Sequence, residues 1–135
     1  MFSCLFYRLI LLTKYKKMLE LNHKKLNVWK VSTELVVNIY AITDNYPKSE
    51  LYCLTSQMKR AAVSISSNIS EGAARFSKKE RKRFFEIARS SLVELDMQMK
   101  ISLKLKFTDD RASKEIGRKT NVVFAMLSNL IKSTK

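Results

Sequence analysis

The sequence predicts an all-α protein, an antiparallel up-down-up-down four-helix bundle. Three observations support this class. The chain has 135 residues, enough for one domain, and hydrophobic residues make up 46% of it, so a substantial core can be buried. Two glycines and one proline are the strong helix breakers in the whole chain. The apolar residues recur at intervals of three and four, the spacing of one helix face, with no strand pattern or internal repeat.

The first 23 residues differ from the rest and are expected to be an extension, with the bundle in residues 24–135. Residues 1–12 are mostly apolar, but this run is too short to span a bilayer and lacks the charges and cleavage site of a secretory signal. We therefore expect no stable membrane insertion. Three explanations remain open: a misassigned start with the true one at Met18, a membrane-surface anchor, or an extra packed helix. We favour the misassigned start or a disordered extension.

The first helix is expected from about Leu26 to Asp44, with Asn27 as its N-cap. Pro47 prevents its continuation, because the residue before a proline is driven from helical angles. The predicted buried row is Trp29, Thr33, Val36, Tyr40 and Thr43, widened by Val28, Leu35, Ile39 and Ile42.

The second helix is expected to begin with Ser49 as N-cap and to reach about Arg75. Its residues step by three and four along Leu51, Leu54, Met58, Ala61, Ile65, Asn68 and Gly72, and a second row contains Ala62, Ser66, Ile69 and Ala73. From Ala61 onwards the side chains of both rows are small or slim, which lets neighbouring backbones come close. A buried Asn68 and the serine hydroxyls would then need hydrogen-bond partners. The alternative is a partly exposed, loosely packed helix end.

Two capping patterns open the remaining helices. Ser77 and Glu80 have capping-box spacing, so the third helix should begin at Lys78 and continue to about Phe107. Its predicted buried row is Phe85, Ala88, Leu92, Leu95, Met99 and Ser102. Acids at Asp109 and Asp110 suit the start of the fourth helix. Its row is Ile116, Thr120, Val123, Leu127 and Leu130, backed by Phe124 and Ile131, and Gly117 weakens it.

Catalytic chemistry is not expected, and neither is a cofactor. The sequence contains no phosphate-binding glycine loop, no dinucleotide turn and no metal-ligand motif. His23 is the single histidine, and no cysteine or carboxylate cluster accompanies it, which argues against a metal site and a Ser-His-Asp site. Cys4 and Cys53 are too few for a disulfide framework and suit a reducing cytoplasm.

Glu71 and Glu94 border the predicted buried rows, so each must find a partner if it is buried. One hypothesis is that Glu71 or Glu94 bonds across the second and third helices, with Arg60 or Arg75 as partner. The alternative, held equally, is that both carboxylates lie at solvated edges.

The net charge of +14 and the isoelectric point of about 10.0 favour a polyanionic partner, chiefly nucleic acid. Six cations and one acid, Glu80, lie within nine residues at the junction of the second and third helices. The candidate nucleic-acid-binding residues are Arg75, Lys78, Lys79, Arg81, Lys82, Arg83 and Arg89. Phe76 lies inside this run and could stack on a base or staple the turn. The alternative is a solvated charged face without a nucleic-acid role.

Several segments of the chain form a recognisable set. The longest is residues 54–72, and the others are Leu26-Asn27-Val28-Trp29-Lys30, Tyr46-Pro47-Lys48, the trio Ser77, Glu80 and Phe84, and Ser91-Leu92-Val93-Glu94-Leu95-Asp96. Together they resemble the family of four-helix bundles named after intervening sequences in bacterial 23S ribosomal RNA genes, and the resemblance extends over about residues 24–130. Departures are Ser66 where many members have proline, Ala73-Ala74 in place of an aromatic-glycine pair, and Asp96 in place of glutamate.

The resemblance implies a ring-like homopentamer of antiparallel bundles, with no catalytic residues to carry over. It also implies a relation to the accessory variability determinants of diversity-generating retroelements, basic pentamers that bind nucleic acid and a reverse transcriptase. A five-fold ring needs two different surfaces on every protomer. The residues expected to serve packing within and between protomers are Ala62, Ser66, Asn68, Ile69, Gly72 and Glu94. A protein-interaction scaffold whose charge serves an acidic partner is the alternative function.

Overall fold

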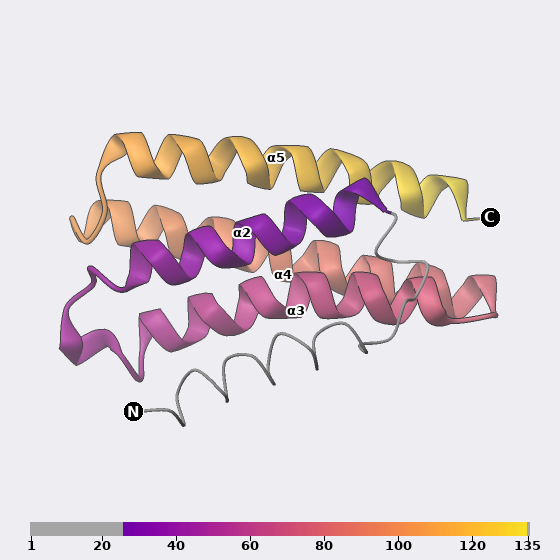
Figure 1. Ribbon diagram of the computed structural model, residues 1–135, viewed down its shortest axis with the longest axis horizontal. Helices are drawn as coiled ribbons and strands as arrows, with labels where there is room; N and C mark the ends of the chain where they lie inside the picture. The colour runs from indigo at the N-terminus through magenta and orange to yellow at the C-terminus, as the bar shows by residue number, and fades with distance from the viewer. Residues whose placement is uncertain (1–25, 135) are drawn as a thin grey trace, which may run out of the picture.

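The computed structural model of the chain describes residues 26–134, which contain four α-helices and no strand (Figure 1). The helices are α2 (Asn27–Thr43), α3 (Leu54–Ala74), α4 (Lys78–Lys104) and α5 (Asp110–Ser133), and a 3₁₀ turn, η2 (Lys48–Glu50), precedes α3. The predicted all-α bundle is thus confirmed for this part of the chain. The expected extension at residues 1–23, with Cys4 and His23, lies outside the described residues.

The helices pack as a closed set of four neighbours. The contact between α3 and α4 is the most extensive, α2 packs on α3, α4 packs on α5, and α5 returns to pack on α2 (Figure 1). Within the described residues no Cα atom of α2 lies within 8 Å of one of α4, so the two helices occupy diagonal corners. The core runs between all four helices along the length of the bundle.

The predicted buried row of α4 is confirmed at all six positions, from Phe85 to Ser102. The row of α5 is confirmed from Ile116 to Leu127, but Ile131 rather than Leu130 completes it, and Phe124 is 42% exposed. Both helices carry their buried residues at helical spacing over about four to five turns, which leaves one face to bury.

The buried face of α2 is shifted from the main predicted row towards the predicted widening residues, and Ser32 is its one unpredicted member. This face consists of Val28, Ser32, Leu35, Ile39 and Thr43. Trp29 is half-buried and Tyr40 exposed, because aromatic rings can border a core while a smaller residue faces its centre. Ser32 is fully buried; its hydroxyl donates to the Trp29 carbonyl oxygen at 2.7 Å and accepts from Ser66 Oγ at 3.0 Å. The predicted N-cap role of Asn27 is wrong, since Leu26 precedes the helix without a side-chain cap.

The start of α3 is also later than predicted. Ser49 caps no helix, because residues 48–50 form the 3₁₀ turn and α3 begins at Leu54. The Glu50 carboxylate takes over the capping role, since its Oε2 accepts the Leu54 N–H at 3.3 Å. Leu51, the first member of the predicted row, is consequently exposed.

The end of α4 comes at Lys104 instead of Phe107. Lys106 adopts a left-handed conformation, with φ of 60°. The Phe107 N–H then bonds to the Ser102 carbonyl oxygen at 3.0 Å, and the Lys106 N–H to that of Leu103 at 3.1 Å. This is a Schellman motif, in which glycine is the usual left-handed residue. With lysine there, the sequence carries no visible stop signal.

Gly72 packs directly against α4. A Cβ added there would lie 2.7 Å from Phe85 Cε1 and 3.1 Å from the Arg81 carbonyl oxygen. Phe85 is almost fully buried, and the Arg81 oxygen is backbone, so neither neighbour can move aside freely. Glycine is therefore a steric requirement at this position.

The first prediction compares the two glycines. Gly72→Ala should lower the free energy of unfolding by about 1–3 kcal/mol, because overpacking exceeds the gain in helix propensity. Gly117→Ala is the matched control, since apart from its chain neighbours and the backbone of its own helix no atom lies within 4 Å of its added Cβ. That variant should be more stable by about 0.5–1 kcal/mol. Urea unfolding measures both, and a stable Gly72→Ala variant would contradict the proposed crowding.

Tyr46, between α2 and η2, makes the stability of the core depend on pH. Its ring packs on Phe107 with centroids 5.6 Å apart, and its hydroxyl is buried, with the Ser102 hydroxyl as its polar neighbour. Burial raises the pKa of Tyr46 above its ordinary 10.0, and the Ser102 hydroxyl partly opposes this shift.

The second prediction concerns alkaline stability. The unfolded chain releases the Tyr46 proton near pH 10, whereas the folded chain holds it to higher pH. The stabilising contribution is therefore complete below about pH 10 and falls as the pH rises towards the folded pKa. Tyr46→Phe should keep the ring contact and flatten this loss relative to the native chain. Thermal melts between pH 8 and 11 measure it, and parallel pH profiles for both chains would contradict the assignment.

Candidate nucleic-acid interface

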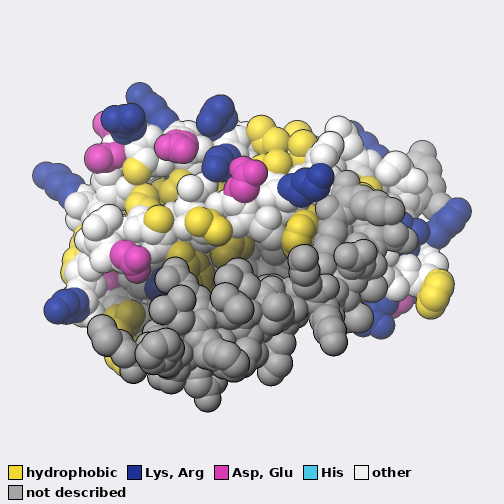
Figure 2. Space-filling model, viewed as in Figure 1, with side chains coloured by type: hydrophobic (Ala, Val, Ile, Leu, Met, Phe, Trp, Pro, Cys, Tyr) yellow, Lys and Arg dark blue, Asp and Glu magenta, His cyan; other side chains and the backbone are white. Residues whose placement is uncertain are grey.

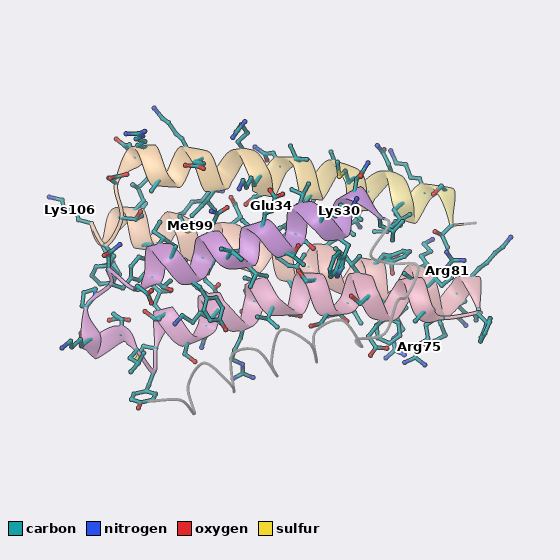
Figure 3. All side chains as sticks on the ribbon, viewed as in Figure 1. Lys30, Glu34, Arg75, Arg81, Met99 and Lys106 are labelled. Carbon is teal, nitrogen blue, oxygen red and sulfur yellow. The ribbon has the colours of Figure 1, made fainter. Side chains whose placement is uncertain are left out.

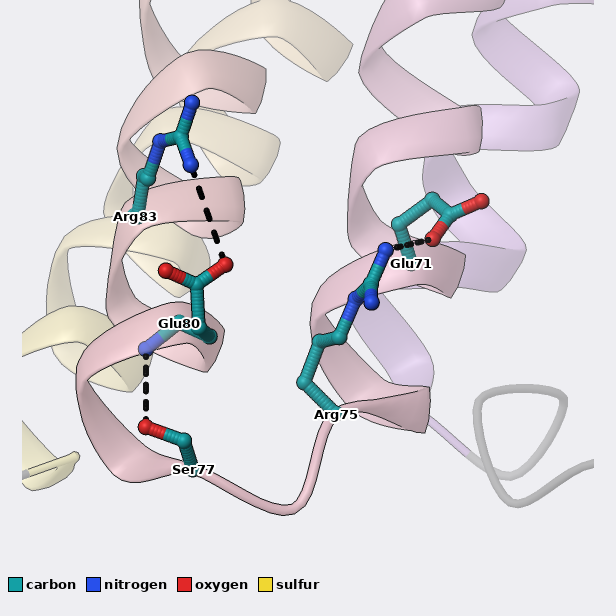
Figure 4. A network of polar contacts seen from close by, with 5 residues as sticks. All are labelled: Glu71, Arg75, Ser77, Glu80 and Arg83. Carbon is teal, nitrogen blue, oxygen red and sulfur yellow. Dashed lines mark hydrogen bonds and ion pairs between the residues drawn. The ribbon is translucent and has the colours of Figure 1, made fainter.

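A three-residue connection joins α3 to α4 at one end of the bundle. Arg75 has an extended backbone that ends α3, and Ser77 caps α4 by accepting the Glu80 N–H on its Oγ at 3.4 Å (Figure 4). The predicted N-cap and the predicted start at Lys78 are thus confirmed. The close approach of the two helices at Gly72 keeps this connection short.

Three of the predicted phosphate-binding residues are exposed and have no ion pair with any described acid. They are Lys78, Lys79 and Lys82, all in the first two turns of α4. The positive end of the helix dipole lies at the same place. These ammonium groups are available to a partner without the loss of an existing contact.

Two arginines of the turn are exposed but paired with acids on their own helices. Arg75 Nη2 lies 3.1 Å from Glu71 Oε2, and Arg83 Nη1 lies 3.7 Å from Glu80 Oε2 (Figure 4). The Arg75 guanidinium also lies 4.9 Å from the centre of the Phe84 ring. Exposed pairs of this kind contribute little to stability, so a phosphate could replace the carboxylate at small cost.

Arg81 and Arg89 are less accessible than the sequence suggested. Arg81 is half-buried, and its Nε atom is buried without a hydrogen-bond partner in the described residues. Arg89 is half-buried with its guanidinium 5.9 Å from the centre of the Phe124 ring on α5. Arg81 lies at the same end as Arg75 (Figure 3), whereas Arg89 belongs to the α4–α5 side. The seven predicted residues therefore divide into an exposed group and a packed group.

The proposed carboxylate contacts across α3 and α4 are absent. Glu71 pairs with Arg75 within α3, and Glu94 is exposed and accepts the Gln98 side-chain amide at 3.1 Å. The alternative of solvated edges is correct for both. Arg60 and Glu94 both line a polar pocket of about 390 Å³, and its remaining lining is Gln57, Ala61, Ser64 and Ser91.

Two serine pairs link α3 to its neighbouring helices instead, and Asn68 bonds within α3. Ser64 Oγ and Ser91 Oγ lie 2.9 Å apart and join α3 to α4, while Asn68 Nδ2 donates to the Ser64 carbonyl oxygen at 2.8 Å. Ser66 joins α3 to α2 through Ser32. The sequence signalled that Asn68 and the serines needed partners but not which residues would supply them.

The small residues of α3 face the interior of their own bundle. Ala62, Ile69 and Gly72 are buried there, and Ser66 and Asn68 are half-buried and make the hydrogen bonds just described. A different surface is apolar and exposed on the outer side of α4. We call it the α4 stripe. Its residues step by four and are 41–56% exposed: Val93, Met97, Ile101 and Leu105. Sequence analysis missed this row because the stronger buried row of the same helix obscured it.

Basic side chains also lie away from the α3–α4 connection. Lys and Arg are visible at both ends of the face in Figure 2, and Lys106 marks the end opposite to Arg75 in Figure 3. No helix from α2 to α5 is long and apolar enough to cross a membrane. Among residues 26–134, no three His, Cys, Asp or Glu side chains gather closely enough to hold a metal ion.

Comparison with known proteins identifies one family and one similar fold. The sequence profile of the family described as 23S rRNA-intervening sequence protein matches residues 24–129. A similar solved structure is that of a protein of unknown function from the S23 ribosomal protein family of Bacteroides thetaiotaomicron, at 1.70 Å resolution. The two are 19% identical with a TM-score of 0.72, over 78% of this chain and 95% of that chain, which indicates a shared fold. No curated protein sequence matches the chain.

Proposed function

The chain belongs to the 23S rRNA-intervening sequence protein family, and we propose that it is a non-enzymatic, basic, oligomeric bundle that binds nucleic acid, RNA in particular, through phosphate contacts. The net charge of +14 makes approach to a polyanion favourable over long distances. Phosphate contacts require no base recognition, so the proposal does not depend on a sequence preference.

The observation that carries the proposal is the exposed group of cations at the start of α4. Lys78, Lys79 and Lys82 have no acidic partner among the described residues. They lie at the N-terminus of α4, where the helix dipole is positive and also attracts anions. Arg75 and Arg83 can join them by exchanging a carboxylate for a phosphate. Arg81 and Arg89 then hold the site in place through their packing and are not proposed as direct contacts.

The oligomer is proposed to be a ring-like homopentamer of antiparallel up-down-up-down bundles. Support for the helix order comes from the short connections and from Figure 1, in which each helix returns along the one before it. Support for a ring comes from two exposed apolar surfaces on diagonal helices, the α4 stripe and a patch with Val37 and Tyr40 on α2. A ring uses two different surfaces of this kind on each protomer.

We place this assembly in the cytoplasm, where the exposed free thiol of Cys53 would remain reduced. A reverse transcriptase or another protein is a possible further partner. A second candidate function is a protein-interaction scaffold, and the α4 stripe favours it because exposed apolar rows commonly mark protein interfaces. In that case the positive charge serves an acidic protein.

The third prediction tests phosphate binding by the exposed lysines. The triple variant Lys78→Gln, Lys79→Gln, Lys82→Gln should weaken RNA binding and reduce the slope of log affinity against log salt by about 2, because each lost contact to a single strand removes about 0.7. Fluorescence anisotropy between 50 and 300 mM salt, about the range in which such binding changes steeply, measures both quantities.

The matched control removes the same charge at the opposite end, through Lys48→Gln, Lys104→Gln and Lys114→Gln. All three of these lysines are exposed and form no ion pair with a described acid. Equal losses in both triple variants would indicate a diffuse charge effect and remove the proposed site. Weak binding without any salt dependence would refute the nucleic-acid function.

The fourth prediction concerns assembly. Light scattering should give a mass about five times the 15.7 kDa of one chain. Met97→Glu should reduce this mass, because it introduces a charge into the α4 stripe that burial in an interface would desolvate. Asn121→Glu, at an exposed position of α5 outside both proposed surfaces, should leave it unchanged. A native chain that is monomeric at micromolar concentration would refute the ring.

A further inference from the structure

Phe76 is the most exposed large apolar side chain among the described residues. Its relative exposure is 103%, so its ring packs against no other described part of the molecule. The possibility that it staples the turn is therefore excluded. A fully hydrated phenylalanine at the tip of a connection adds nothing to folding, whereas in contact with a partner it would bury a large apolar area.

The surroundings of Phe76 are basic. Arg75 precedes it directly, and Lys78 and Lys79 follow within three residues, at the start of α4. The connection is held on both sides: the extended backbone of Arg75 ends α3, and the Ser77 cap begins α4. An aromatic face beside exposed cations is complementary to a nucleobase beside its phosphates, and less so to an apolar protein surface.

Whether the bound nucleic acid is single-stranded or duplex follows from which base surfaces the Phe76 ring can contact. In a duplex the base faces are covered by neighbouring base pairs, so a protein contacts only the grooves and the backbone. In loops, bulges and ends the bases can be splayed out and stacked on aromatic side chains. An isolated ring on a protruding connection is suited to the second case.

We propose that Phe76 is a stacking platform for an unpaired base, and that the ligand class of the basic turn is single-stranded nucleic acid. This inference rests on the proposed function, since it assigns the kind of nucleic acid that the same turn binds. Lys78 and Lys79 hold the adjacent phosphates, and Phe76 distinguishes an unpaired strand from a duplex of equal charge.

The fifth prediction compares three polyanions on the full chain: a 12-nucleotide single-stranded RNA, its duplex, and inorganic polyphosphate, all of about the length that one such site can cover. Phe76→Ala should weaken binding of the single strand about 5- to 100-fold, the usual loss for one stacked base. Binding of the duplex and of polyphosphate should change less than about twofold, because neither offers a free base face.

Two further variants sharpen this test. Tyr52→Ala removes another exposed aromatic, 89% exposed, from the connection before α3 at the opposite end, and should leave all three affinities unchanged. Phe76→Trp should preserve single-strand binding, and its indole fluorescence should be quenched by the single strand but not by polyphosphate. The native chain, which retains Trp29, supplies the reference signal.

The outcomes separate the two proposals. If Phe76→Ala binds the single strand as the native chain does, while the triple lysine variant binds it weakly, the stacking inference is wrong and the proposed function stands. Equal losses for all three polyanions would also overturn stacking, since a base-independent effect would then be responsible. If no polyanion binds the native chain, both proposals fail, and the ring of Phe76 is better explained as a protein contact.

Discussion

The close contact between Gly72 and Phe85 determines the geometry of the end that carries the candidate site. Because Gly72 has no side chain, the Phe85 ring can occupy the space beside the α3 backbone. The two helices meet closely there, and a connection of three residues is sufficient to join them. A chain segment this short cannot fold back over the bundle. Phe76 and the neighbouring cations are consequently presented to solvent, and their exposure follows from a packing constraint inside the core.

A second constraint comes from the polar residues between the helices. Ser32, Ser66, Ser64 and Ser91 connect α3 to both of its neighbours by hydroxyl contacts of 2.9–3.0 Å. Such contacts add less stability than apolar packing of the same positions, but an axial shift of one helix would leave the hydroxyls without partners. They therefore fix the register of α3. Register matters for function because it places the end of α3, and hence Arg75, opposite the first turn of α4.

Local signals made most of the fold predictable. The predicted α4 row was complete, and the cap at Ser77 was visible because a capping box depends on residues three positions apart. The acids at Asp109 and Asp110 marked the start of α5. The errors have a different origin. The face of α2 depends on Ser32 meeting Ser66, which lies 34 positions further along the chain. The end of α4 depends on a left-handed lysine, whose conformation has no sequence signature. The first feature was decided by a partner distant in the chain and the second by an unusual backbone conformation.

The candidate site was predictable as a concentration of charge but not as an arrangement. Sequence alone treats seven cations as equivalent, whereas the fold packs Arg81 and Arg89, pairs Arg75 and Arg83 with carboxylates, and leaves three lysines unpaired within the described residues. This division affects binding, because an exposed pair costs little to exchange, while a packed guanidinium would lose its contacts on moving. It also reduces the entropy lost on binding, since the connection and first turn are already held by Gly72, Ser77 and the paired arginines. A polyanion thus meets an end of the bundle whose backbone is fixed and whose free cations can adjust.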